Sequence, residues 1–82
     1  MENAMRLAKM AEVSRIVAEP KSTLYWRITR GEFVPPIKQG ERAAAFILEE
    51  IDAVMRARAA GASVEEIRAL VRKLVAARRM AA

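Results

Sequence analysis

Hydrophobic residues recur at helical spacing in the first third of the chain. Apolar side chains at positions 10, 13, 16 and 17 are spaced i, i+3, i+6 and i+7, which predicts a short helix over 10–17. Pro20 disfavours helical geometry at the residue before it and suits the first turn of the next helix. A second helix is therefore predicted from about Pro20 to Arg30, ended by Gly31, with two side chains facing the core: Leu24 and Ile28. Two short helices separated by a three-residue break form a candidate helix-turn-helix.

The segment after Gly31 is predicted to be extended, because two consecutive prolines exclude a helix there. Beyond it, the local signals allow two interpretations. A turn at Gly40 favours a β-hairpin within 37–46. The three alanines that follow the turn have high helix propensity and allow a single helix over 41–60 instead. Only the later part of that helix is fixed by hydrophobic spacing, through Ile51, Val54 and Met55.

A last helix is predicted from Ser63 to about Arg79. Serine followed three residues later by Glu66 is a capping box, and the apolar side chains beyond it cover an arc of about 140°. This face must be buried, either on the rest of the chain, on a membrane, or on a second copy. A membrane is not expected because aromatic anchors are missing. Self-association is preferred because so small a domain has little spare surface, and it is assigned to Val64, Ile67, Leu70, Val71 and Leu74.

Composition narrows the class of protein. The chain has 82 residues, enough for one small domain, which we divide into a helix-turn-helix unit over 1–61 and a C-terminal helix over 62–82. There is no cysteine and no histidine, which excludes disulfides, Cys/His zinc sites and His-dependent acid–base catalysis. We therefore expect no enzyme activity, no cofactor, no metal site and no small-molecule ligand. No membrane span or signal peptide is recognisable, so a cytoplasmic protein is expected.

Charge points to a polyanionic partner. The 15 basic and 10 acidic residues give a net charge of +5. Residues 1–40 carry seven basic and four acidic side chains, and residues 63–82 carry five and two, so both ends are cationic. Lysines and arginines that replace the counterions of DNA gain affinity without needing a particular sequence.

The outer face of the second helix has the chemistry of a recognition helix. Steps of about 100° from Leu24 place polar, cationic and aromatic side chains opposite the core. Hydroxyls and backbone N–H groups bind phosphates, and arginines reach phosphates or guanine O6 and N7. Trp26 has two interpretations, contact with DNA or a partner and burial under the wing or another helix, of which burial is preferred. Tyr25 is expected to border the core. The alternative is a solvated surface helix. The candidate DNA-contact residues are Lys21, Ser22, Thr23, Tyr25, Trp26, Arg27 and Arg30 on this helix and Lys38 and Arg42 on the hairpin.

Several short motifs together resemble a known family. In order they are Glu12-Val13, Pro20-Lys21-Ser22-Thr23-Leu24-Tyr25, Gly31-Glu32-Phe33, Pro35-Pro36-Ile37-Lys38, Gly40 and Glu50-Ile51-Asp52-Ala53. Over about 7–60 the chain resembles the AlpA-type phage regulators, small winged-helix proteins related to excisionases. The resemblance implies a MerR-like winged helix-turn-helix, mainly α with a small β-hairpin wing, in which 42–46 is a wing strand. The C-terminal amphipathic helix is then an addition to this fold.

The resemblance also implies a function. It indicates a sequence-specific DNA-binding regulator of a prophage or integrative element. Such a protein controls transcription of integration and excision genes or acts as an excisionase-like directionality factor. Its partner would be double-stranded DNA, bound as a homodimer or cooperative oligomer. The alternative is a protein-interaction adaptor that uses the apolar C-terminal helix.

Overall fold

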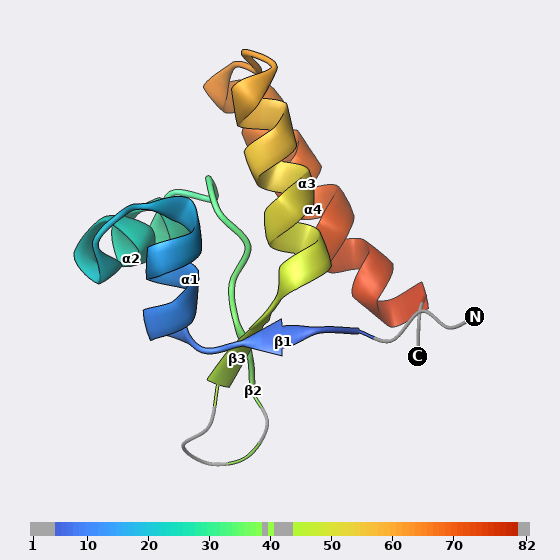
Figure 1. Cartoon of the computed structure of the whole chain (residues 1–82). Coiled ribbons are helices and arrows are strands. Elements are labelled where there is room, and N and C mark those ends of the chain that lie inside the picture. The colour runs from blue at the N-terminus through green and yellow to red at the C-terminus, as the bar shows by residue number, and fades with distance from the viewer. Residues whose placement is uncertain (1–4, 39, 41–43, 81–82) are drawn as a thin grey trace.

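The computed structural model describes residues 5–38, 40 and 44–80. Its elements, in chain order, are β1 (Leu7–Ala8), α1 (Met10–Val17), α2 (Lys21–Thr29), β2 (Ile37–Lys38), β3 (Ala44–Ile47), α3 (Leu48–Ala59) and α4 (Val64–Met80). The short helices α1 and α2 lie together on one side, the longer pair α3 and α4 on the other, and the small sheet lies beneath both (Figure 1). The prediction of a mainly helical fold with a small β-hairpin wing and an added C-terminal helix is confirmed.

The hairpin interpretation is confirmed over the described residues, and the single helix over 41–60 is wrong. Residues 44–47 form the central strand β3, and helix α3 begins only at Leu48. β3 pairs antiparallel with β2, and Ala45, Phe46 and Ile47 are buried. Burial and strand pairing thus override the helix propensity of the alanines. Gln39 and residues 41–43 lie outside the described part of the chain.

A third strand, β1, was not predicted. Leu7 and Ala8 pair antiparallel with Ile47 and Phe46, so β3 is central in the order β1-β3-β2. The Leu48 N–H donates to the Arg6 carbonyl at 2.9 Å, which continues this pairing to the first residue of α3. Two residues are too few to show the alternation by which a strand is recognised in a sequence.

The predicted helix boundaries are set by local hydrogen bonds. At the end of α2 the Glu32 N–H donates to the Arg27 carbonyl at 2.8 Å and the Gly31 N–H to the Ile28 carbonyl at 3.1 Å. With Gly31 at φ +76°, this is a Schellman motif. Before α4 the Ser63 hydroxyl accepts from the Glu66 N–H at 3.1 Å, and the Glu66 carboxylate accepts from the Ser63 N–H at 2.7 Å. The capping box is confirmed.

The core joins all the helices. Its largest fully buried side chains are Phe33, Phe46, Leu24, Ile51, Val13, Val34 and Val54. α4 packs on α3 and adds Ile67 and Val71, which are 4% and 5% exposed. These two residues, assigned to self-association from the sequence, are therefore buried within the chain. The reason is that the core below α3 is open on the α4 side, so the apolar arc of α4 closes it. Leu70 and Leu74 are half-buried, and Val64 remains exposed.

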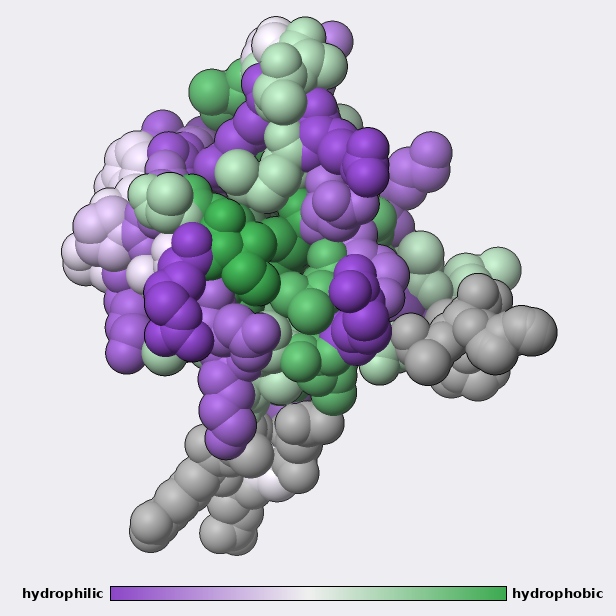
Figure 2. Space-filling model, in the orientation of Figure 1, coloured by the Kyte–Doolittle hydropathy of each residue, from purple (hydrophilic) through white to green (hydrophobic). Residues whose placement is uncertain are grey.

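One face of the molecule carries an apolar area (Figure 2). Figure 2 shows hydrophobic side chains in the middle of this face, framed by hydrophilic ones. Ile16, 52% exposed, lines a hollow between α1 and α3 together with Leu48 and Met55. Separately, none of the helices in the described ranges is long and apolar enough to cross a membrane.

The turn between α1 and α2 contains a strained residue. Ala18 has φ +59° and ψ +42°, the left-handed conformation that normally favours glycine. The turn is held by the Glu19 N–H, which donates to the Ser14 carbonyl at 3.2 Å, and by the Ser14 hydroxyl, which donates to the Glu19 carbonyl. These bonds fix the angle between the two helices despite the strain.

We therefore expect Ala18→Gly to stabilise the protein. Left-handed geometry costs an L-residue about 1–2 kcal/mol, and the greater freedom of unfolded glycine offsets about 0.5–1 kcal/mol of that, which leaves a net gain of about 0.5–1 kcal/mol. Urea unfolding measures the change. The matched control is Ala69→Gly in the exposed middle of α4, which should lose about 0.5–1 kcal/mol. If both variants lost the same stability, the strain at Ala18 would be refuted.

Candidate nucleic-acid interface

One side of α2 faces away from the core. Leu24 is fully buried beneath the helix and Ile28 is half-buried. The opposite side, which we call the α2 outer face, consists of exposed residues: Lys21, Ser22, Tyr25, Trp26, Thr29 and Arg30. Thr23, a further predicted contact residue, is half-buried at its edge. The face combines cations, hydroxyls and aromatic rings, as predicted for a recognition helix.

The preferred interpretation of Trp26 is wrong, and so is that of Tyr25. Trp26 is 54% exposed and Tyr25 57% exposed, although burial was expected for the first and a place beside the core for the second. The cause is the packing of α1, which meets α2 through the core cluster that contains Leu24 and leaves the other side uncovered. Both rings are therefore part of the outer face.

Arg30 is held in place on this face by two contacts. Its guanidinium carbon lies 4.8 Å from the centroid of the Trp26 ring, within cation–π range. Its Nε donates to the Glu32 carboxylate at 2.9 Å. The side chain is still 47% exposed, and its two terminal nitrogens make no hydrogen bond to the described residues. A side chain fixed in this way has little rotamer entropy left to lose on binding.

The structure places Arg27 away from the outer face. Its Nε and Nη2 donate to both carboxylate oxygens of Glu19, at 2.9 and 2.7 Å, and its Nη1 donates to Glu32 at 3.4 Å. Only a quarter of the side chain is exposed. Arg27, a candidate DNA contact from the sequence, therefore stabilises the position of α2 through ion pairs on the side away from the outer face.

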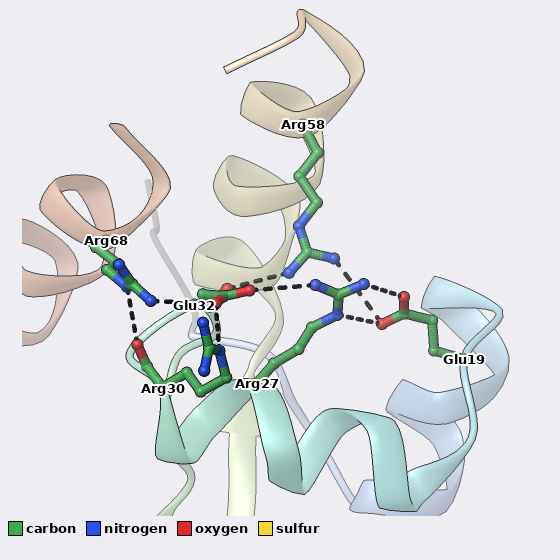
Figure 3. A network of polar contacts seen from close by, with 6 residues as sticks. All are labelled: Glu19, Arg27, Arg30, Glu32, Arg58 and Arg68. Atoms are coloured by element: carbon green, nitrogen blue, oxygen red, sulfur yellow. Dashed lines mark hydrogen bonds and ion pairs between the residues drawn. The ribbon is translucent and has the colours of Figure 1, made fainter. Parts of the chain in front are cut away.

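Glu32 is the centre of a polar network at the end of α2 (Figure 3). The residue is 6% exposed, and its carboxylate accepts hydrogen bonds from Arg27, Arg30 and Arg68. Its carbonyl accepts from Arg58 of α3 at 3.0 Å. Arg68 of α4 also donates to the Arg30 carbonyl, at 3.0 Å. The end of the candidate recognition helix is thus bonded to both C-terminal helices.

The ionic state of the network follows from these contacts. The hydrogen bond from Arg30 lowers the pKa of Glu32, and the hydrogen bond from Arg27 lowers the pKa of Glu19. Both carboxyls are therefore ionised at neutral pH. Four arginines surround these two carboxylates, so the network keeps a positive charge beside the outer face. Sequence reasoning missed Glu32, because three of its four partners lie four or more residues away and no local pattern marks them.

The wing can be described only in part. Lys38 is exposed on β2, opposite Ala44 of β3. Arg42, the second wing residue predicted to contact DNA, lies outside the described residues. Within 5–38, 40 and 44–80, no group of three His, Cys, Asp or Glu side chains is placed to hold a metal ion.

A helix-turn-helix with an exposed cationic face beside a small antiparallel sheet is an architecture found in DNA-binding modules. A family model described as prophage CP4-57 regulatory protein (AlpA) matches residues 6–59. The match covers more than half of the chain, so the chain belongs to the AlpA family of phage regulatory proteins, whose regulators bind DNA. Neither the curated proteins nor the solved structures contain a match. α4 lies beyond the matched segment.

The Glu19 and Glu32 carboxylates make the stability of the folded chain depend on pH in the acid range. The pKa values of Glu19 and Glu32 are lower in the folded chain than the value of about 4.3 of a free glutamate, so both carboxylates stabilise the fold above that pH. The contribution is lost as the pH falls through the folded-state pKa values. We expect the melting temperature to drop as the pH falls below about 5.

The Glu32→Gln variant should have a lower melting temperature than the unsubstituted protein at neutral pH. Its melting temperature should also fall less on acidification. Circular dichroism over this pH range measures both. The matched control is Glu65→Gln, because Glu65 is 83% exposed in its pair with Arg68 and such a pair is worth little. A Glu32→Gln curve parallel to that of the unsubstituted protein would show that Glu32 does not carry the pH dependence.

Proposed function

We propose that the chain is a sequence-specific regulator that binds double-stranded DNA through the α2 outer face. The observation that carries this proposal is a braced helix whose cations and aromatic rings are exposed while its apolar side is sealed in the core. Membership of a phage regulatory family supports the same conclusion. The DNA would be a control region of a prophage or integrative element. Binding there regulates integration and excision genes or directs recombination.

Arg30 is the residue best placed to read a base. Because Nε is bonded to Glu32 and the side chain is 47% exposed, the two terminal nitrogens, which bond no described residue, would serve as a pair of donors. Guanine presents two acceptors, O6 and N7, in the major groove, and a bidentate arginine is the commonest specific contact to them. Trp26 would keep the guanidinium in this orientation through its ring.

The remaining exposed residues suit the DNA backbone. Lys21 and Ser22 lie in the first turn of α2, where backbone N–H groups and the helix dipole also favour a phosphate. Lys38 on β2 would contact the backbone beside the bound groove, together with Arg42. Phosphate contacts fix the register of the helix, and the base contact gives the sequence preference.

We also infer that binding is cooperative, through contacts between copies. Of the residues assigned to self-association, Val64, Leu70 and Leu74 keep surface that is not used inside the chain. A second copy on the neighbouring site would raise affinity without a new contact to DNA.

Salt-dependent binding tests the function. With four to six phosphate contacts, the affinity for duplex fragments of the element's attachment and promoter regions should fall with a log–log slope of about −4 to −5. Arg30→Ala should lose about 1–3 kcal/mol of binding free energy on the preferred site and relax the sequence preference at one base pair. The slope of the salt dependence should stay nearly unchanged. Fluorescence anisotropy at several salt concentrations gives both quantities.

The matched control is Arg56→Ala. Arg56 is also an exposed arginine with one carboxylate partner, Asp52 at 2.9 Å, but it lies on α3. This variant should bind as the unsubstituted protein does. A slope near zero would refute DNA binding, and equal losses from Arg30→Ala and Arg56→Ala would refute the assignment of Arg30.

A further inference from the structure

An apolar groove of about 510 Å³ lies between the end of α2 and α4. Ile28 and Gly31 form one wall, Val71 and Val75 the other, and Phe33 contributes to the lining. The groove therefore borders the segment that links α2 to the Glu32 network, while the α2 outer face lies on a different side of the helix.

The rim of the groove is cationic. Arg72 and Arg79 line it from α4, two helical turns or about 10 Å apart along the axis. Both are exposed, and neither makes an ion pair with any residue in the described ranges. On the same helix, Arg68 is bonded to Glu32 and Arg78 to Glu50, so those two charges are neutralised inside the molecule.

We propose that this groove binds an acidic amphipathic helix of another protein. Apolar side chains at i and i+4 of that helix would enter the groove, and carboxylates two turns apart would pair with Arg72 and Arg79. The proposal is independent of DNA binding. It gives this member of the family, through the helix that lies beyond the family match, a surface for recruiting another protein.

Other occupants fit the groove less well. Duplex DNA needs cations and hydrogen-bond donors along its path, whereas the lining here is mainly aliphatic and aromatic. A second copy would have to supply acidic side chains beside apolar ones, as at the start of α4. There, however, Glu66 already caps Ser63, which leaves Glu65 as a single carboxylate against two arginines.

The test is a selection with the full-length chain from a displayed library of helix-stabilised peptides. The library has a fixed apolar stripe and random acidic, basic or neutral flanks. We expect the enriched peptides to carry acidic flanks and to shift the backbone amide signals of Ile28, Gly31 and Val75. The double variant Arg72→Glu, Arg79→Glu should weaken their binding about tenfold. Lys73→Glu, a single charge reversal at an exposed neighbour outside the groove, should leave it within about twofold.

Ala76→Phe provides a second variant, because Ala76 is an exposed lining residue and a ring there fills the groove without disturbing the core. It should abolish peptide binding at an unchanged melting temperature. The proposal would be overturned if no peptide were enriched, or if binding were insensitive to Arg72 and Arg79. The proposal would also be overturned if the double charge reversal weakened the binding of random duplex DNA as strongly as the binding of peptide. The same holds if light scattering showed that the reversal dissociates a dimer formed in the absence of peptide.

Discussion

The buried carboxylate of Glu32 is the interaction on which the arrangement of the helices depends. A carboxylate that is 6% exposed needs cationic partners, because an unpaired buried charge is strongly destabilising. Its partners come from α2 and α4, and its carbonyl is bonded to α3. The ends of these three helices must therefore meet at one point. This constraint sets the orientation of α2 relative to the rest of the chain.

The same constraint divides the arginines into two groups. Arg27, Arg58, Arg68 and Arg78 are directed inward to Glu19, Glu32 and Glu50, and these contacts stabilise the packing. The other arginines among the described residues remain on the surface, and Arg30 belongs to both groups because its Nε is bonded while its side chain is 47% exposed. The net charge of +5 thus overstates how uniformly basic the surface is. The ion pairs of each arginine with these carboxylates decide whether its charge is available to a partner.

Local signals made much of the fold predictable. The proline break, Gly31 and the Ser63 capping box act within a few residues, and each gave a correct helix boundary. Strand β3 was ambiguous because its alanines favour a helix, and only pairing and burial decide it. The exposure of Trp26 and the role of Glu32 depend on partners far along the chain. Lys21, Ser22 and Arg30 lie on the exposed side of α2 as expected, whereas the inward position of Arg27 and the contacts that hold Arg30 could not be predicted from local patterns.

Trp26 gives the most direct measurement of the central claim, because it is the only tryptophan of the chain and lies in the middle of the α2 outer face. Its fluorescence can be quenched with acrylamide, a neutral quencher that is insensitive to the charge of DNA. The account predicts that saturating duplex DNA from the element's control region strongly reduces quenching. Unchanged quenching with the protein fully bound would show that DNA occupies another surface.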